Sequence, residues 1–358
     1  MDTVLESARG LIRASAPHRA IHLLEPYSAR PEAARLLAAA YRRDARYADC
    51  VRLVDAGPAC VQMLYEKAMS LAQLSDGPAA LAAFDAVLQR DPDRAAAWFG
   101  SHGPALELEG IDAALDRLGR ASACPGANGK YRAHAYALLR LSGAGDRARR
   151  LFDRDLAAHP RRRALADGVD ALLPALDCGV RLFGLSASLL GHALDRADRP
   201  GLVLEFGVRR GTSIRHLAAL SGQQVHGFDS FEGLPEDWGG EQGGVLTTEA
   251  ELPEVPDNVR LHPGWFSDTV APFLAAHPQP VRLANIDSDI YSSACQVLSA
   301  LAPRIGPGTV LVFDEFIGNR TWADDEYRAF AEFIDRHPMS WRVIAVGPAT
   351  KQVAIRIL

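Results

Sequence analysis

The sequence predicts an α/β fold, a mostly parallel sheet under helices, preceded by an all-α domain of helical repeats. Residues 1–165 contain almost no β-branched runs, and their apolar residues recur every three or four positions, as in amphipathic helices. From about residue 200, short apolar runs alternate with helical stretches, which is typical of βαβ units. We therefore expect a repeat domain over 1–165, a helical linker or lid over 166–200 and an α/β domain over 201–358.

Composition excludes several classes of function. The formal net charge of −5 gives no reason to expect a nucleic-acid partner. No apolar run approaches the roughly 20 residues that a membrane span requires, and the acidic N-terminus does not resemble a signal peptide. The five cysteines form no CxxC pair, so neither a zinc site nor a disulfide framework is expected. We expect a cytoplasmic protein.

An internal repeat is visible in the first half. Two positions recur every 34 residues, a small one at Ala80, Ala114 and Ala148 and a large one at Phe84, Leu118 and Phe152. A proline follows the large residue by eight positions at Pro92 and Pro160. This pattern resembles the second helix of a tetratricopeptide repeat. Such repeats build grooved surfaces, so a protein or carrier partner, a homo-oligomer contact and one wall of a substrate pocket are open alternatives.

The second half begins with a candidate cofactor loop. The strand LVLEFGV carries the pattern Glu205-x-Gly207-x-x-x-Gly211, and the helix that follows starts at Thr212 and Ser213. Glycines at the end of a strand allow a sharp turn and close approach to a ligand, and the helix start offers free N–H groups. The dinucleotide pattern G-x-G-x-x-G is not met, which disfavours a nicotinamide cofactor.

The next strand adds a carboxylate. VHGFDSF places Asp229, with Ser230 after it, eighteen residues beyond Gly211 and at a strand end, where a carboxylate can accept both hydroxyls of a ribose. The alternative is that Asp229 caps a helix.

Acidic residues also follow two later strands. Asp287 and Asp289 come after VRLANI, and Asp314 and Glu315 come after TVLVF. Because the carboxyl ends of parallel strands meet at one edge of an open sheet, these side chains should converge there. The final runs WRVIAVG and KQVAIRIL predict a hairpin at the sheet edge.

Four ordered motifs, EFGVRRGTS, GFDSFEGLPEDW, NIDSDIYSSA and GTVLVFDEF, resemble the macrocin O-methyltransferase family of class I methyltransferases over about residues 180–358. The resemblance implies a Rossmann-like fold with a seven-stranded sheet and S-adenosylmethionine as cofactor, released as S-adenosylhomocysteine. It also implies where the cofactor lies. The methionine part is expected at Glu205, Gly207 and Gly211, the ribose at Asp229, and adenine near Trp265, Phe266 and Ser267. Thr212, Ser213, Ser230 and Asp287 are the other residues expected to bind the cofactor. Core packing is the alternative for the two aromatic residues.

The resemblance further implies a divalent ion, Mg²⁺, at Asp287, Asp314 and Glu315. This sequence departs from the family at the last position, where a second aspartate is common, so a metal-free enzyme with Asp287 as base is an alternative. Asp289 is a second candidate for the catalytic base, with helix capping as its alternative.

The expected activity is transfer of a methyl group to a hydroxyl oxygen of a sugar or glycosylated secondary metabolite, assisted by the metal. Two alternatives remain. One is a methyltransferase for nitrogen or carboxyl acceptors that works without metal, and the other is an inactive binding protein based on the repeats.

Overall fold

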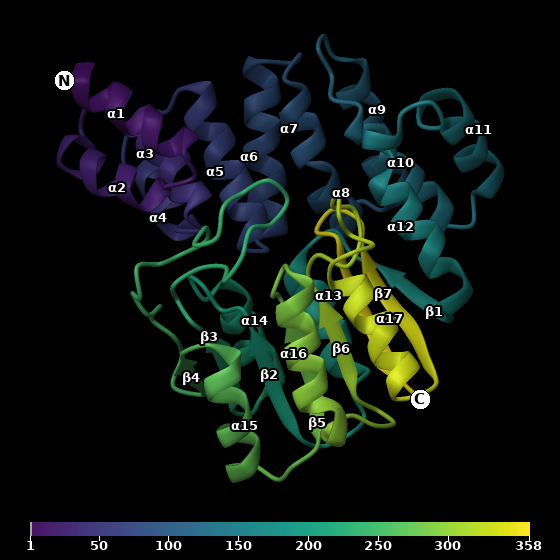
Figure 1. Ribbon diagram of the computed structural model, residues 1–358. Helices are drawn as coiled ribbons and strands as arrows, with labels where there is room; N and C mark the ends of the chain where they lie inside the picture. Colours follow the sequence, from purple (N-terminus) through teal and green to yellow (C-terminus); the bar gives the residue numbers. More distant parts are fainter. Residues whose placement is uncertain (1) are drawn as a thin grey trace.

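A computed structural model describes residues 2–358 and shows a row of helix pairs above an α/β domain (Figure 1). Antiparallel helices follow one another from the N-terminus. Their bounds are α1 (Asp2–Arg13), α2 (Pro17–Leu24), α3 (Pro31–Arg43), α4 (Tyr47–Asp55), α5 (Val61–Gln73), α6 (Gly77–Arg90), α7 (Ala95–Gly100), α8 (His102–Leu108), α9 (Ile111–Ala123), α10 (Lys130–Leu141), α11 (Gly145–Asp155) and α12 (Ala164–Leu172).

The residues that recur in the sequence occupy equivalent places in this row. Ala80, Ala114 and Ala148 lie on α6, α9 and α11, and all three are fully buried. A small buried side chain lets the neighbouring helix approach closely. The helical character predicted for 1–165 is therefore present, whereas the assignment to tetratricopeptide repeats and the three domain boundaries stay predictions.

The turns within the first three helix pairs share one conformation. Ser15, Ala45 and Ser75 have φ of 54°, 58° and 58°, in the left-handed region. A left-handed residue satisfies the carbonyls at the end of one helix and turns the chain into the next. All three turns lie at the same end of their helix pairs, and contacts described below join each of them to the α/β domain.

The second half contains a single eight-stranded sheet in the order β1-β7-β8-β6-β5-β2-β3-β4. The strands are β1 (Leu176–Leu182), β2 (Leu202–Phe206), β3 (Val225–Asp229), β4 (Val259–Pro263), β5 (Val281–Ile286), β6 (Val310–Phe313), β7 (Trp341–Gly347) and β8 (Gln352–Ile357). Only the pairs that β8 forms with β6 and β7 are antiparallel. The seven strands predicted from the sequence all form, as β2 to β8.

Two details of the prediction are wrong. The linker over 166–200 is not purely helical, because it contributes β1, which pairs in parallel with β7. The sheet therefore has eight strands rather than seven, and the C-terminal hairpin is not at its edge. Strand β1 contains Gly179, has a register irregularity and has no fully buried residue, so it lacks the regular alternation of buried and exposed positions that identifies a half-buried strand.

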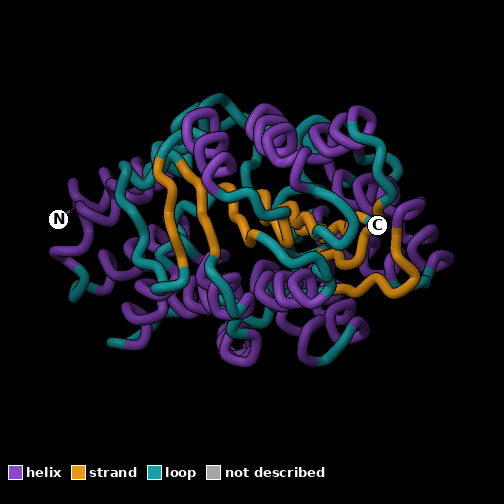
Figure 2. The backbone as a smooth tube through the Cα atoms, turned by 90° about the horizontal axis from the view of Figure 1, so that it is seen from below, coloured by secondary structure: helices purple, strands orange, loops and turns teal. Residues whose placement is uncertain are grey.

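Helices cover both faces of the sheet (Figure 2). Helices α15 (Phe266–Ala276), α16 (Tyr291–Leu301) and α17 (Glu326–Arg336) pack on one face, together with α12. Helices α13 (Ser186–Asp195) and α14 (Thr212–Ser221) pack on the other. Alternation along β2 directs Leu204 and Phe206 to the first face and Val203 to the second. No helix among residues 2–358 is long and apolar enough to cross a membrane.

Candidate functional site

The loop between β2 and α14 turns sharply at the carboxyl end of β2. Gly207 has φ of 96°, and a Cβ there would collide with the backbone carbonyl of Asp287. Gly211, with φ of 78°, is the residue from which α14 begins. Both glycines therefore occupy positions that another residue could adopt only with strain, as their place in the motif predicted.

Asp229, at the end of β3, holds this loop in place. Its Oδ2 accepts the backbone N–H groups of Val208 and Arg209, each at 2.7 Å, and its Oδ1 accepts that of Phe231 at 2.7 Å. A carboxylate has about four acceptor positions, so roughly one remains for a ligand. Asp229 thus has a structural role that the sequence did not predict, beside the ribose contact that stays a prediction.

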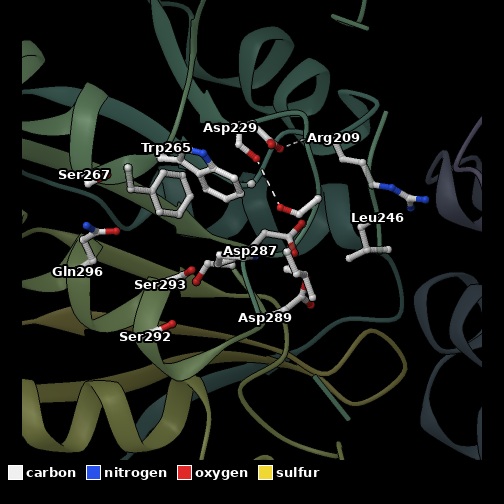
Figure 3. Close-up of a pocket in the computed structure, with 17 residues that line it drawn as sticks. Arg209, Asp229, Leu246, Trp265, Ser267, Asp287, Asp289, Ser292, Ser293 and Gln296 are labelled. Carbon is white, nitrogen blue, oxygen red and sulfur yellow. Dashed lines mark hydrogen bonds between the residues drawn. The ribbon is translucent and has the colours of Figure 1, made fainter. Parts of the chain in front are cut away.

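A cavity of about 480 Å³ opens beside the loop, which is within the usual range for a small-molecule site. Figure 3 shows Trp265 beside Asp229, with Asp287 and Asp289 below them and Gln296 and Ser293 farther out. We call this space the first cavity. The predicted cofactor residues that line it are Gly207, Asp229, Ser230, Trp265, Phe266, Ser267 and Asp287.

The long connection between β3 and β4 closes one side of the first cavity. Leu234, Pro235 and Leu246 from this segment line it. Ser15 in the first repeat turn donates a hydrogen bond to Glu241 at 3.0 Å, which joins the connection to the repeat domain. No pattern in the sequence indicates which residues of this connection face the cavity.

Glu205 lies behind the first cavity and does not line it. Its side chain is fully buried, and its two oxygens accept hydrogen bonds from Ser213 Oγ at 3.0 Å and Asn285 Nδ2 at 3.1 Å. Burial raises the pKa of Glu205 to about 8, although both hydrogen bonds oppose the shift. Glu205 therefore acts, in this arrangement, as a neutral or nearly neutral link between β2, β5 and α14.

The acidic residues converge at the carboxyl ends of β5 and β6, as predicted. Burial, followed by the charges of Asp314 and Asp289, raises the pKa of Asp287 well above its usual value. Burial and the charges of Glu315 and Asp314 raise the pKa of Asp289 to about 7, and burial and Glu315 raise that of Asp314 to about 7. Like charges in a desolvated site resist simultaneous ionisation, so the cluster holds protons near neutral pH.

A further carboxyl group, that of Glu326, lies beneath this cluster. It is fully buried at the start of α17, and its oxygens accept the backbone N–H groups of Ser288 and Glu315, each at 3.2 Å. Glu326 therefore fixes the two loops that carry the acidic residues. Glu326 is the first residue of α17, and no motif in the sequence indicates its contacts with these two loops.

The three predicted metal ligands do not fit a magnesium site in the arrangement that they adopt. Mg²⁺ requires oxygen ligands that converge with near-octahedral geometry. Among residues 2–358, no group of three or more His, Cys, Asp or Glu side chains is arranged to hold a metal ion. Glu315 instead forms an ion pair with Lys351, whose Nζ lies 3.1 and 2.9 Å from its two oxygens, and Asp314 accepts a hydrogen bond from Gln352 at 2.6 Å.

A second cavity, of about 320 Å³, lies on the other side of the carboxylates. Its α/β-domain walls include Asp314, Glu315, Thr212 and Ser213, which do not line the first cavity. Four residues line both cavities, namely Arg209, Leu246, Asp287 and Asp289. The two predicted catalytic aspartates therefore stand at the boundary between the two spaces.

Comparison with known proteins supports the resemblance to methyltransferases that the sequence motifs indicate. Residues 204–316 match the sequence family described as methyltransferase domain. A tetracenomycin-related 4'-O-methyltransferase of Streptomyces olivaceus, which acts on a 2,3-dimethoxy-α-L-rhamnosyl compound by its name, is 31% identical over 142 residues, 33% of this chain and 53% of that protein. Mycinamicin III 3''-O-methyltransferase of Micromonospora griseorubida is 29% identical over 190 residues, 44% of this chain and 70% of that protein.

The chain thus spans about half the length of the first of these relatives. Among solved structures, a calicheamicin methyltransferase aligns with a TM-score of 0.39 and 23% identity, over 63% of this chain and 91% of that chain. The matched region includes the loop after β2, Asp229 and all four acidic residues at the ends of β5 and β6. The C-terminal half is confirmed as resembling class I methyltransferases.

Proposed function

We propose that this chain, whose residues 204–316 form a methyltransferase domain, transfers the methyl group of S-adenosylmethionine to a hydroxyl oxygen of a sugar or glycosylated metabolite. One observation carries the proposal. A cavity of cofactor size and a second, carboxylate-lined cavity meet at Asp287 and Asp289. An in-line displacement needs the acceptor oxygen directly behind the methyl carbon, opposite the sulfonium sulfur, with a base beside that oxygen. Two cavities that adjoin at a pair of carboxyl groups allow this arrangement.

The first cavity supplies the contacts that the cofactor would need, and the bound cofactor would supply the electrophilic methyl group. We assign the ribose to the remaining acceptor position of Asp229 and the adenine to Trp265 and Phe266, whose side chains line the cavity. The methionine part is assigned to Gly207, which lines the cavity and whose missing Cβ allows the backbone of Asp287 to lie close beside it.

Asp289 is the better candidate for the base that removes the acceptor's proton. A general base is most effective when its pKa lies near the working pH, and the pKa of Asp289 is raised to about 7. Asp287 would then orient the acceptor through its carboxyl group. We route no step through a divalent ion, because Asp314 and Glu315 are engaged by Gln352 and Lys351.

The relatives support oxygen as the acceptor atom, since both are named as O-methyltransferases, and the name of the first specifies a rhamnosyl compound. The carboxylate cluster also disfavours one alternative. A carboxylate acceptor would bring another negative charge beside Asp287 and Asp289, which costs free energy in a buried site. The homo-oligomer and the partner of the repeats stay predictions.

Methyl transfer tests the proposal. The purified chain is incubated with S-adenosylmethionine carrying a tritiated methyl group and a set of sugar glycosides, and the rate is followed across pH. We expect the rate to rise with pH through about 7 and to fall by about a hundredfold or more in Asp289→Asn, the usual contribution of a general base. A rate that is independent of pH and unchanged in the variant would contradict the assignment of the base.

A further inference from the structure

The second cavity has one wall that does not belong to the methyltransferase domain. Ala45 from the turn between α3 and α4, Tyr47 at the start of α4 and Gln73 at the end of α5 line it together with the carboxylates. Asp287 and Asp314 lie close enough to Tyr47 for their charges to contribute to its raised pKa, after burial as the largest cause. The N-terminal helices thus reach these carboxylates, although more than 200 residues of sequence separate the carboxylates from Tyr47 and Gln73.

Ion pairs and hydrogen bonds fix this wall to the methyltransferase domain. Asp44, which is 1% exposed, forms an ion pair with Arg210 at 2.8 Å. Arg209 donates a hydrogen bond to the backbone carbonyl of Arg43 at 3.3 Å. In the next repeat turn, Ser75 accepts the backbone N–H of Ala187 at 3.1 Å. These contacts flank Tyr47 and Gln73 in the chain, so the two side chains are held at a defined place beside the carboxylates.

The lining of the second cavity indicates what it would bind. A phenol hydroxyl, an amide and several aliphatic hydroxyls face it, and His216 adds a buried Nε2 that has no hydrogen-bond partner among the described residues. Together with the carboxylates, these groups can accept or donate hydrogen bonds at many points. Two cations, Arg209 and Arg210, also line the cavity, but both already lie beside Asp44, and the carboxylates would repel an anion. A neutral molecule with several hydroxyl groups therefore matches the lining better than an anion or an aromatic hydrocarbon does.

We propose that the second cavity is the acceptor site and that Tyr47 and Gln73 of the helical repeats bind a neutral, polyhydroxylated acceptor there. The inference rests on the proposed function, because it takes the first cavity as the cofactor site. The repeats are then part of the active site. Their two side chains orient one acceptor hydroxyl toward Asp289, and small errors in such orientation lower methyl transfer steeply.

Substitutions in the repeats, far from the cofactor loop, test this proposal. Gln73 is exposed at the end of its helix, so Gln73→Trp fills the cavity with little risk to folding. Gln89→Trp, at another exposed helix position that does not line the cavity, is the matched control. The acceptors are p-nitrophenyl α-L-rhamnopyranoside and p-nitrophenyl β-D-glucopyranoside. Affinity for S-adenosylhomocysteine is measured on the same samples by calorimetry.

We expect Gln73→Trp to lower kcat/KM for the glycosides by about a hundredfold, the cost of displacing an acceptor by about an ångström, with unchanged affinity for S-adenosylhomocysteine. Gln89→Trp should match the unmodified chain. Tyr47→Phe removes one hydrogen bond to a neutral group and should raise KM by about threefold to tenfold, with a smaller change in kcat.

Three other outcomes are possible, and each would contradict a different one of these assignments. Equal rates for Gln73→Trp and the unmodified chain would overturn the role of the repeat wall. If the unmodified chain binds S-adenosylhomocysteine but methylates neither glycoside, the assignment of a polyhydroxylated acceptor is wrong. Absence of S-adenosylhomocysteine binding in the unmodified chain would contradict the proposed function itself, rather than this inference alone.

Discussion

At the scale of single residues, carboxyl groups that retain protons dominate the site. Glu205 and Glu326 are buried and Asp287 is partly buried, and the pKa of each is raised chiefly by the removal of its carboxyl group from water. A buried carboxylate without a cation is costly, whereas a protonated carboxyl group can be accommodated with hydrogen bonds. Two properties should therefore depend on pH, namely the stability of the folded domain and the rate of the expected methyl transfer.

Glu205 offers the clearest case of that coupling. The pKa of Glu205 is raised from 4.5 to about 8, so between these pH values the folded chain keeps a proton that the unfolded chain has lost. Stability contributed by this group is present below pH 4.5 and is lost as pH rises toward 8. Glu205→Gln stays neutral and can donate to Asn285 Oδ1, which is buried without a partner.

We therefore expect the free energy of unfolding of Glu205→Gln, relative to the unmodified chain, to increase as pH rises across this window. Urea unfolding at several pH values measures the difference, and Glu109→Gln at an exposed position is the control. A difference that does not change with pH would show that Glu205 ionises normally in the folded chain.

At the scale of elements, the turn between β7 and β8 adds the cation that balances the acidic cluster. Lys351 lies in that turn and contacts Glu315, and its Nζ also donates to Asn319 at 2.6 Å. The ammonium group of Lys351 can offset the negative charge of these carboxylates, a role that the family resemblance assigned to a divalent ion. Asp314 and Glu315 thus keep their predicted place at the end of β6 while their oxygens serve other partners.

The arrangement predicts how the chain responds to divalent ions. We expect methyl transfer to be unaffected by chelator treatment, and Mn²⁺ to bind the unmodified chain no better than it binds Asp314→Asn, as followed by electron paramagnetic resonance. Lys351→Met should create or strengthen an Mn²⁺ site, because it frees both oxygens of Glu315. Lys67→Met, at a lysine paired with Asp55 in the repeats, is the control. Tight Mn²⁺ binding by the unmodified chain, lost in Asp314→Asn, would contradict this account.

The sequence predicts an element well where the residues that determine it lie close together in the chain. The glycine loop and the acidic strand ends were predictable, since each lies within one βα unit and the topology brings such ends together. Strand β1 was not, because it lies at a sheet edge, none of its residues is fully buried and its burial does not alternate regularly. Lys351 was missed for a different reason, since its contact with Glu315 spans 36 residues and depends on a turn whose conformation the sequence leaves open.

At the scale of the whole molecule, the row of N-terminal helices lies along the upper side of the methyltransferase domain in Figure 1. Turns of three successive helix pairs contact the lower domain, through Ser15, Asp44 and Ser75. No local pattern marks these turns as contact sites, because domain docking depends on side chains far apart in the sequence. For that reason Tyr47 and Gln73 were not predicted as site residues, although a wall of the substrate pocket was one alternative for the repeats.

Docking should contribute measurably to stability. Asp44→Ala removes the nearly buried partner of Arg210, which then keeps, among the described residues, only its ion pair with the exposed Glu251. We expect a loss of about 3 kcal/mol in the free energy of unfolding, the usual cost of breaking a buried pair from one side. Asp116→Ala breaks an exposed pair with Arg120 and should cost about 1 kcal/mol or less. Equal losses in chemical unfolding would show that the interface pair is no stronger than a surface pair.

Calorimetric titration with S-adenosylhomocysteine decides whether the first cavity is the cofactor site. We expect one binding site per chain with a Kd of about micromolar or lower. Gln296→Trp, whose indole would enter the first cavity, should abolish the binding, while Ser299→Trp, an exposed position on the same helix that does not line the cavity, should retain it. Absence of heat with the unmodified chain, or equal binding by Gln296→Trp, would contradict the assignment of the first cavity as the cofactor site.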